Sequence, residues 1–415
     1  MSLVSYRDDG ELCVDSVPLE AIAREHGTPC YVYSRMALEA GYREFERACD
    51  GCDALICYAV KANSNLAILN LLARLGSGFD IVSGGELRRV LAAGGSPGKI
   101  VFSGVGKTEA EMRAALAARI FCFNVESEEE LNRLDRVARD AGMRAPVSLR
   151  VNPDVDPRTH PYIATGLRDN KFGVTYAEAP ALYRKAAALP GLQPIGIGVH
   201  IGSQITDMEP FVSALEKVLE FVDALQAGGI ALSHLDMGGG LGIRYRDERP
   251  PALAEYVARL YAELGNRNVK LLFEPGRALV GNAGLLLTRV EYLKRGPAKN
   301  FAVVDAAMND LLRPALYQAW HEILPVRRRR GRPATWDVVG PVCESADFLG
   351  LERALDIEQG DLVAILSAGA YGMSMSSNYN TRPRAPEVII DGATTRLVRA
   401  REPVESLFAL ERLLP

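Results

Sequence analysis

Between residues 54 and 274 the chain alternates short apolar runs with longer segments in which apolar residues recur every three or four positions. The short pattern is typical of buried strands and the long one of amphipathic helices. Strands are expected at 54–60, 78–82, 99–103, 120–125, 146–152, 192–200, 231–237 and 269–274, and helices at 65–75, 85–93, 108–118, 127–141, 209–227 and 251–264. Eight strands separated by helices predict a parallel sheet that closes into a (β/α)8 barrel.

Two of the expected helices begin with a capping signal. Thr108 is followed by Glu111, and Ser127 by Glu130, which is the spacing of a capping box. The connection formed by residues 153–173 is too long and too rich in Pro, Asp and Thr to be a simple turn. Connections of this kind are often functional loops or lids, and we expect one here.

After residue 277 the pattern changes. Strand-like runs follow one another without helices between them, at 285–294, 301–305, 336–340, 361–366 and 387–398. This pattern predicts a mostly antiparallel β domain. Residues 11–17 also resemble a strand, and residues 402–414 resemble an amphipathic terminal helix. We therefore expect a barrel domain at 28–277 and a β-rich domain made of 1–27 and 278–415.

Composition narrows the function to small-molecule chemistry. The 415 residues carry a net charge of −4 without a basic stripe, so no nucleic-acid partner is expected. The arginine-rich run 327–332 lacks interleaved aromatic residues and is expected to be a solvated loop. No apolar run is long enough to span a membrane, and residues 1–25 are too charged to be a signal peptide, so a cytoplasmic location is expected.

The seven cysteines are dispersed and odd in number, which favours reduced thiols over a disulfide framework. Cys49 and Cys52 have the spacing of a zinc-binding pair. No second pair and no histidine lies near them, so no metal site is expected.

Reactive groups of a β/α barrel lie at the carboxyl ends of its strands. The residues found there are Lys61, Ser83, His200, Asp236 with Gly238–Gly240, and Glu274 with Gly276 and Arg277. A lysine at such a place is either a salt-bridged structural charge or a nucleophile. An imidazole there is either a hydrogen-bonded core residue or a group that faces a ligand.

Residues 238–242 are either a tight turn or a phosphate-binding loop, because residues without a Cβ let backbone N–H groups approach phosphate oxygens. The loops after the last two strands are the usual phosphate site of the barrel, which favours the second interpretation. A lysine, a phosphate-binding loop and the carboxylate of Glu274 together suggest pyridoxal 5′-phosphate as the cofactor. Lys61 would hold it covalently, and Glu274 would face its ring nitrogen.

Six motifs occur in an order that resembles the pyridoxal-phosphate-dependent decarboxylases of the alanine-racemase fold, also called group IV. They are Tyr58–Asn63 (YAVKAN), His200–Gln204 (HIGSQ), Gly238–Gly240, Glu274–Arg277 (EPGR), Cys343–Asp347 (CESAD) and Ala370–Tyr371. The resemblance extends from about residue 25 to the C-terminus. It implies fold type III of the pyridoxal-phosphate enzymes, which combines the barrel with a β-rich C-terminal domain.

The resemblance also implies roles for individual residues. Lys61 binds the cofactor covalently, His200 stacks on its ring and Glu274 pairs with its ring nitrogen. Residues that hold the phosphate or neighbouring substrate groups are Ser203, Gly239, Gly276 and Arg277. The family further implies a homodimer with shared active sites, in which Cys343 donates a proton and Glu344 binds the distal ammonium of the substrate.

Residues 308–317 (MNDLLRPALY) are similar to the branch of this family that acts on diaminopimelate. The branch implies that Arg313 and Tyr317, with Arg277, bind a distal carboxylate, and that Tyr371 lies between cofactor and substrate. Arginine suits a carboxylate because it binds bidentately. The expected reaction is decarboxylation of meso-2,6-diaminopimelate to L-lysine and CO2, the last step of lysine biosynthesis.

Two alternatives remain open. The first is a decarboxylase of ornithine, arginine or lysine, for which Arg313 would be superfluous because these substrates lack a distal carboxylate. The second is a pyridoxal-phosphate-binding homologue without turnover, which the presence of Lys61 and Cys343 disfavours. Cys343 could also serve only in packing, as isolated cysteines often do.

Overall fold

The computed structural model describes residues 3–156, 159–160, 165 and 170–415. The loop predicted at 153–173 therefore lies partly outside the described residues. The chain divides into two compact units. The barrel unit comprises residues 41–243 and 249–278, and the β-rich unit comprises 1–40, 244–248 and 279–415.

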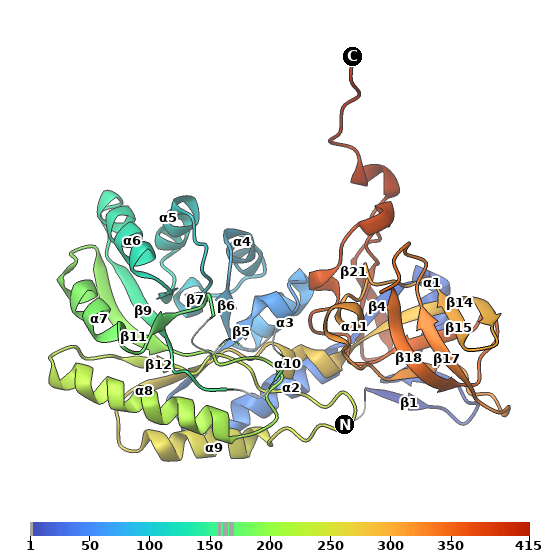
Figure 1. The fold of residues 1–415 in the computed structure, drawn as a ribbon, viewed down its shortest axis with the longest axis horizontal. Helices are drawn as coiled ribbons and strands as arrows, with labels where there is room; N and C mark the ends of the chain where they lie inside the picture. Colours follow the sequence, from blue (N-terminus) through green and yellow to red (C-terminus); the bar gives the residue numbers. More distant parts are fainter. Residues whose placement is uncertain (1–2, 157–158, 161–164, 166–169) are drawn as a thin grey trace. The chain divides into compact units, whose positions relative to one another are not determined.

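The barrel unit contains the predicted closed parallel sheet (Figure 1). Its strands are β5 (Ala54–Ala59), β6 (Gly78–Ile81), β7 (Ile100–Phe102), β8 (Cys122–Val125), β9 (Ala145–Asn152), β11 (Leu192–Gly198), β12 (His234–Asp236) and β13 (Lys270–Phe273). Each pairs with the next in parallel register, and β13 pairs with β5 to close the barrel. A short additional strand, β10 (Val174–Thr175), pairs with β9. The strand prediction is confirmed for all eight members.

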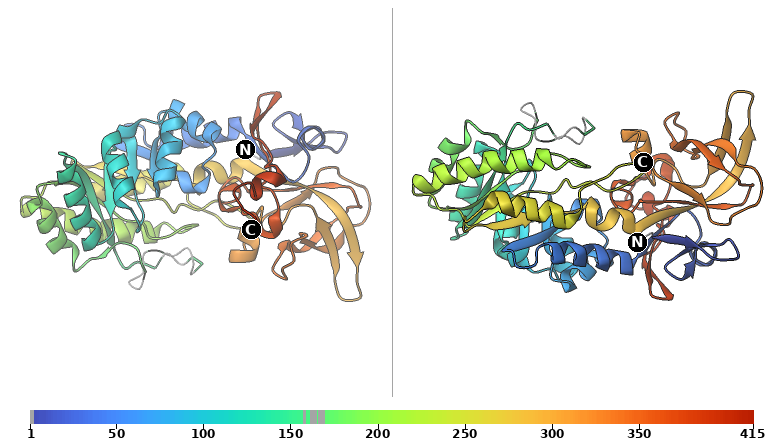
Figure 2. Two further views of the ribbon diagram at one scale, coloured as in Figure 1. Left: turned by 90° about the horizontal axis from the view of Figure 1, so that it is seen from above. Right: turned by 90° about the horizontal axis from the view of Figure 1, so that it is seen from below.

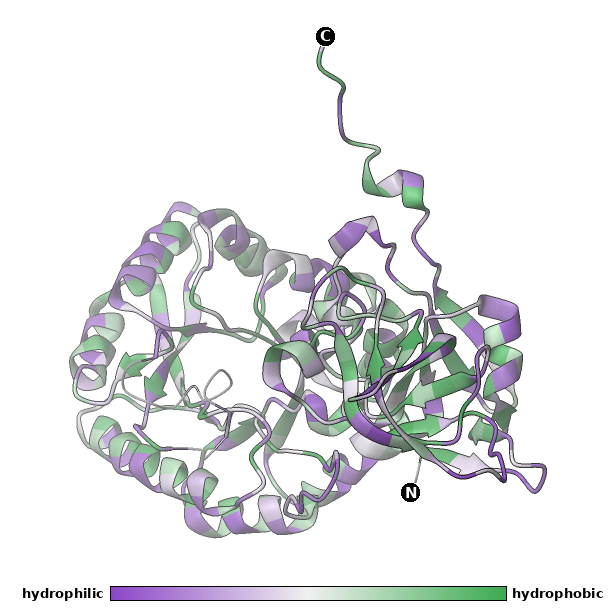
Figure 3. Cartoon of the chain, turned by 45° about the vertical axis from the view of Figure 1, so that its right-hand side comes forward, coloured by the Kyte–Doolittle hydropathy of each residue, from purple (hydrophilic) through white to green (hydrophobic). Residues whose placement is uncertain are grey.

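The helices form an outer ring around these strands, and the hydropathy colours show polar and apolar residues alternating along them (Figure 3). They are α3 (Leu66–Arg74), α4 (Gly84–Ala92), α5 (Glu109–Ala118), α6 (Glu128–Asp140), α7 (Ala179–Ala188), α8 (Glu209–Ala227) and α9 (Leu253–Leu264). Helices α8 and α9 lie side by side on the outside of the barrel (Figure 2). Their inward faces are apolar, as an amphipathic helix on a sheet requires.

The two predicted capping signals have different outcomes. Thr108 and Glu111 form the complete capping box at the start of α5. At α6 the Ser127 hydroxyl accepts from the N–H of Glu130, but the Glu130 carboxylate accepts from the N–H of Glu126 at 3.0 Å instead of from Ser127. The Glu130 carboxylate also forms an ion pair with the buried ammonium of Lys107, 2.7 Å away.

The β-rich unit contains a mixed sheet in the order β18-β17-β15-β14-β4-β20-β21, in which β16 and β19 also pair with each other and β19 with β14. The strands are β4 (Cys30–Ser34), β14 (Gly284–Arg295), β15 (Asn300–Val304), β16 (Ile323–Pro325), β17 (Ala334–Val339), β18 (Phe348–Leu355), β19 (Leu362–Ile365), β20 (Glu387–Asp391) and β21 (Thr394–Arg399). Most pairs are antiparallel as predicted, while β15 with β17 and β4 with β20 are parallel.

Further elements of the β-rich unit precede or flank this sheet. They are a small sheet of β1 (Val4–Tyr6), β2 (Leu12–Val14) and β3 (Val17–Pro18), and the helices α1 (Leu19–His26) and α11 (Arg313–Tyr317). Helix α2 (Arg35–Ala48) begins in the β-rich unit and ends in the barrel unit, and α10 (Arg277–Val280) leads back. No helix of the described residues is both long and apolar enough to cross a lipid bilayer.

The unit boundaries differ from the predicted ones in two places. The barrel unit begins at residue 41 instead of 28, because β4 pairs with β14 and β20 of the β-rich sheet. Residues 244–248, which follow β12 in the chain, belong to the β-rich unit.

The predicted terminal helix at 402–414 is wrong. The chain forms only a short 3-10 turn, Val404–Leu407, and then extends with Leu410, Leu413 and Leu414 more than nine-tenths exposed. A short helix is only marginally stable unless its apolar face packs against other residues. Here the three leucine side chains are exposed to solvent.

Candidate active site

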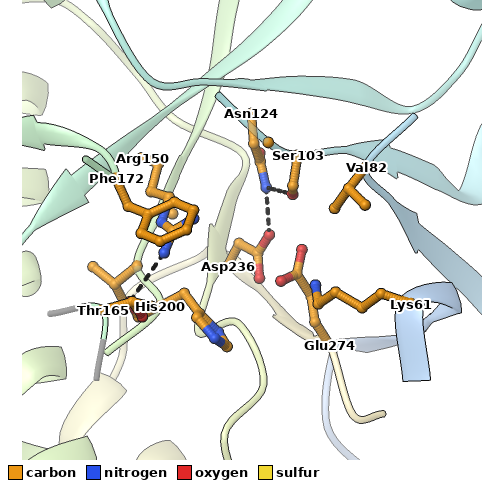
Figure 4. A pocket seen from close by; sticks show the side chains of 13 residues that line it. Lys61, Val82, Ser103, Asn124, Arg150, Thr165, Phe172, His200, Asp236 and Glu274 are labelled. Atoms are coloured by element: carbon orange, nitrogen blue, oxygen red, sulfur yellow. Dashed lines mark hydrogen bonds between the residues drawn. The ribbon is translucent and has the colours of Figure 1, made fainter. Parts of the chain in front are cut away.

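A cavity of about 180 Å³ opens at the carboxyl ends of the barrel strands. Figure 4 shows side chains from different strands pointing into it. Its polar lining comprises Lys61, Ser103, Asn124, Arg150, Thr165, His200, Asp236 and Glu274. The position is the one where β/α barrels place their reactive groups. The structure therefore brings together the lysine, imidazole and carboxylates that the sequence placed at strand ends.

Lys61 lies in a 3-10 turn, Val60–Ala62, directly after β5. Its Nζ lies 2.5 Å from Oδ2 of Asp80, whose side chain is completely buried, while about one-third (34%) of the Lys61 side chain is exposed. Asp80 was missed in the sequence interpretation. A charged residue within the otherwise apolar run GFDI of β6 was the only signal for it.

Glu274 follows β13, and its carboxyl group lies beside that of Asp236 at the end of β12 (Figure 4). Burial and the carboxylates of Asp236 and Asp80 raise the pKa of Glu274 well above its usual value. Burial also raises the pKa of Asp236, against hydrogen bonds that lower it, including those from the Gly238 N–H and the Asn124 amide. Two neighbouring buried carboxyl groups hold a proton more tightly than separate ones do. Oε1 of Glu274 has no hydrogen-bond partner in the described part of the chain.

His200 is fixed by the glycine turn after β12. Its Nδ1 accepts a hydrogen bond from the N–H of Gly239 at 3.1 Å, so the proton of the neutral ring lies on Nε2. Burial, with the nearby charges of Arg150 and Lys61, lowers the pKa of His200 well below its usual value. The ring is therefore neutral at physiological pH.

The turn requires glycine for steric reasons. A Cβ on Gly239 would lie 2.3 Å from the carbonyl oxygen of Glu274, and one on Gly238 would lie 2.7 Å from Nδ1 of His200. After β13, a Cβ on Gly276 would lie 3.0 Å from that of Ala62. The backbone after three strands is thus packed closely around the cavity.

Ser203 and Arg277, both predicted to help hold the cofactor or substrate, lie together. Nη2 of Arg277 donates to the Ser203 hydroxyl at 2.9 Å. Arg277 is buried, with 6% of its surface exposed. A buried guanidinium beside a hydroxyl and close-packed glycines is suited to bind an anion such as a phosphate.

A second buried network, also missed from the sequence, supports the cavity. The Glu126 carboxylate accepts from the N–H groups of Gly104 and Gly173, at 2.9 and 3.0 Å, and forms an ion pair with Arg150. Nη2 of Arg150 donates to the carbonyl oxygen of His200 at 3.3 Å. Glu126 lies after β8 in a polar run that the sequence interpretation assigned only to a helix start.

The other predicted site residues belong to the β-rich unit. Arg313 and Tyr317 begin and end α11, so they lie on one face of it. Tyr371 has a left-handed backbone conformation, with φ of 55°. Cys343 is exposed, and its N–H donates to Oδ1 of Asn380 at 2.9 Å. Glu344 is exposed and accepts a hydrogen bond from the Tyr379 hydroxyl at 3.3 Å.

The residues of the barrel cavity fit pyridoxal phosphate. The cofactor needs an amine for its aldehyde, an acid for its ring nitrogen and donors for its phosphate. Lys61 supplies the amine in the same cavity as Glu274, and Oε1 of Glu274 would accept a hydrogen bond from the protonated ring nitrogen. Arg277, Ser203 and the glycine turns supply groups suited to the phosphate.

Comparison with known proteins agrees with this geometry. Residues 35–281 match the family model "Pyridoxal-dependent decarboxylase, pyridoxal binding domain". The diaminopimelate decarboxylases of Vibrio cholerae and Pseudomonas aeruginosa are each 59% identical to this chain over the full length of both proteins. The crystal structure of diaminopimelate decarboxylase from Helicobacter pylori, at 43% identity, superposes with a TM-score of 0.92 over 95% of this chain and 99% of that one. This chain therefore belongs to the pyridoxal-dependent decarboxylases and, among them, to the diaminopimelate decarboxylase family.

Proposed function

We propose that the chain decarboxylates meso-2,6-diaminopimelate to L-lysine and CO2, the last step of lysine biosynthesis. The single observation that carries the chemistry is that Lys61 and Glu274 line the same cavity. Full-length identity of 59% to diaminopimelate decarboxylases supports the substrate. The Helicobacter pylori relative was crystallised with L-lysine, which would be the product here.

When bound, pyridoxal phosphate supplies a ring that accepts the electron pair released as the bond between Cα and the carboxylate breaks. The protein's own residues prepare the site. Glu274 would keep the ring nitrogen protonated, and the neutral ring of His200 would provide a flat surface for stacking. Arg277 and Ser203, with Gly239 and Gly276, would hold the phosphate. Lys61 would hold the aldehyde carbon of the cofactor.

The residues of the β-rich unit recognise the far end of the substrate. Arg313, with Tyr317 and Arg277, binds the distal carboxylate, and Glu344 binds the distal ammonium, because an amino-acid head requires one charge of each sign. Tyr371 would contact both the cofactor and the substrate. Cys343 gives a proton to Cα after CO2 leaves, which completes the product.

We further propose a homodimer whose active sites are shared between subunits, with Cys343 and Glu344 acting in the partner's site. The exposure of both residues is compatible with this assembly. We also propose that the enzyme works in the cytoplasm, as the dispersed cysteines, all of them free thiols, suggest.

The test is CO2 release from purified protein loaded with pyridoxal phosphate and given meso-diaminopimelate, ornithine, arginine or lysine in parallel. We expect release from meso-diaminopimelate and a rate at least about a thousandfold lower from the other three, because a site built for a charged group rejects substrates that lack it. Release from ornithine but not from diaminopimelate would replace the substrate assignment. Absence of release from all four would favour a homologue without turnover.

A further inference from the structure

Arg313 is held by a cluster of aromatic and imidazole side chains that comes partly from a distant stretch of the chain. Residues 244–248 follow the glycine turn after β12 but belong to the β-rich unit. There Tyr245 and Arg246 contact the neighbouring residues His321 and Trp320. The Tyr245 and His321 rings meet edge to face, with centroids 5.3 Å apart, and Cζ of Arg246 lies 4.4 Å from the centroid of the Trp320 ring.

Trp320 is fixed by a second guanidinium. Cζ of Arg353 lies 3.0 Å from the centroid of the same indole ring, and Arg353 is buried, with 6% of its surface exposed. Burial lowers the pKa of Arg353 to about 10. Two guanidinium groups against one indole hold the ring by cation–π attraction. The residue next to His321 in the chain is thereby held in place.

His321 itself is completely buried, and its two ring nitrogens have different partners. Nδ1 lies 2.8 Å from the carbonyl oxygen of Leu366. A carbonyl oxygen only accepts, so Nδ1 carries the proton. Nε2 of the neutral ring then has a lone pair, and Nη1 of Arg313 donates to it at 2.8 Å. The Leu366 carbonyl thus fixes the tautomer that accepts from Arg313.

Arg313 is in contact with Tyr245 as well. Cζ of Arg313 lies 4.6 Å from the centroid of the Tyr245 ring, and Arg313 has 5% of its surface exposed. The Tyr245 ring and the neutral imidazole of His321 both orient the guanidinium, and neither brings a formal negative charge. These two contacts therefore orient the Arg313 guanidinium without adding a negative charge beside it.

We propose that His321 is a positioning residue for Arg313, and that it thereby sets the preference of the enzyme for ligands with a distal carboxylate. Tyr245 acts with it from the other stretch of the chain. The inference rests on the proposed function, in which Arg313 binds that carboxylate. A misaimed guanidinium would lose bidentate geometry, so His321 should affect binding of the carboxylate more than the chemical step.

The test compares two ligands that resemble the product and differ only in the distal carboxylate. L-lysine retains the carboxylate that was distal in meso-diaminopimelate, whereas 1,5-diaminopentane has the same carbon chain and both amines but no carboxylate. Competitive inhibition constants for both ligands, and KM and kcat for meso-diaminopimelate, are measured on the holoenzyme. The variants are His321→Phe, which removes the acceptor, and His321→Gln, which keeps one. Tyr245→Leu removes the ring beneath the guanidinium.

For His321→Phe we expect KM and the L-lysine inhibition constant to rise at least about tenfold, with kcat and the diaminopentane constant changed less than about threefold. Tyr245→Leu should act in the same direction, and His321→Gln should lie nearer to the wild type. His26→Phe, at a mostly buried histidine of α1, is the matched control and should leave all four values unchanged.

Equal rises of both inhibition constants in His321→Phe, or an unchanged L-lysine constant, would overturn the inference. Arg313→Ala separates this failure from that of the proposed function. If Arg313→Ala raises the L-lysine constant and His321→Phe does not, only the role of His321 fails. If Arg313→Ala also leaves it unchanged, the assignment of Arg313 to the distal carboxylate fails, and the inference with it.

Discussion

Oδ2 of Asp80 lies 2.5 Å from Nζ of Lys61, so the amine that we propose to hold the cofactor is paired with a fully buried carboxylate. An anion at this distance stabilises the protonated amine, whereas only the neutral amine is a nucleophile. The carboxylate of Asp80 therefore opposes the reaction of Lys61 in the cofactor-free chain.

Replacing this carboxylate should move the reactivity of Lys61 to lower pH. In Asp80→Asn the amine loses this carboxylate, so we expect the midpoint of the pH profile for covalent cofactor attachment to move to lower pH. Stopped-flow absorbance of the cofactor measures this profile. Asp53→Asn, which breaks the exposed ion pair with Lys270, serves as the control and should keep the wild-type midpoint. An unmoved midpoint in Asp80→Asn would show that the pair does not govern the amine.

Glu274→Gln should make the cofactor-free protein more stable and the enzyme less active. The pKa of Glu274 is raised, so its favourable contribution to folding is complete below the ordinary carboxyl value of 4.5 and is lost as the pH rises. We expect the variant to exceed the wild type by about 1–3 kcal/mol in free energy of unfolding at pH 8, with little difference at pH 4.

The catalytic cost should be large, because an amide cannot keep the ring nitrogen protonated, and kcat should fall by at least about a hundredfold. Urea unfolding at the two pH values and CO2 release measure both effects. Glu255→Gln on the exposed face of α9 is the control and should change neither. A variant that is less stable than the wild type at pH 8 would contradict the raised pKa of this buried carboxyl group.

Cys343→Ala should separate cofactor binding from turnover. The side chain is exposed and anchored only through its backbone N–H to Asn380 among the hydrogen bonds of the described residues, so removing the thiol should not disturb the fold. We expect the absorbance of the bound cofactor to persist and kcat to fall by at least about a hundredfold. Cys52→Ala, at a partly buried thiol of the barrel unit, should retain wild-type turnover. An unchanged rate in Cys343→Ala would remove this thiol from the mechanism.

Glu402 should make the β-rich unit sensitive to acid. Burial alone would raise its pKa, but hydrogen bonds from the Arg384 N–H at 2.9 Å, from Asn378 at 2.9 Å and from the Arg384 guanidinium lower the pKa to about 2. A depressed carboxyl pKa contributes stability that is present above 4.5 and is lost as the pH falls toward 2.

We therefore expect Glu402→Gln to lose about 1–3 kcal/mol in free energy of unfolding at pH 7, after allowance for the partial exposure of the carboxylate. This difference should shrink steadily between pH 5 and pH 2, as the wild-type group gains its proton. Denaturant unfolding across that range measures it, and Glu405→Gln, three residues further along, is the exposed control. A difference that stays constant with pH would point to packing instead of charge.

The barrel could be predicted from the sequence because each strand and helix has its own local spacing of apolar residues. The strand ends then gave Lys61, His200 and Glu274 without any knowledge of their neighbours. Asp80, Glu126 and His321 could not be found in this way, since their partners are distant in the chain or belong to the backbone. Hydrogen bonds and ion pairs between residues so far apart in the chain depend on the closed fold, and a local sequence pattern does not indicate which residues form them.

The errors have the same origin. Residues 402–414 have the spacing of an amphipathic helix, but among the residues that the structure describes no apolar surface covers Leu410, Leu413 or Leu414. Residues 244–248 were expected in the barrel domain, but they belong to the β-rich unit, where Tyr245 and Arg246 contact His321 and Trp320. β4 precedes the first barrel strand, and its partners β14 and β20 lie far downstream.

The placement of β4 has a consequence for synthesis on the ribosome. Its partner β14 leaves the ribosome about 250 residues later, which takes roughly 10–50 s at ordinary rates of translation. During this interval the ribosome makes every strand of the barrel, while the apolar residues of β4 remain without their sheet. The nascent chain therefore completes its β-rich unit around a strand that emerged before the barrel, and a chaperone that shields residues 30–34 should raise the yield of folded protein.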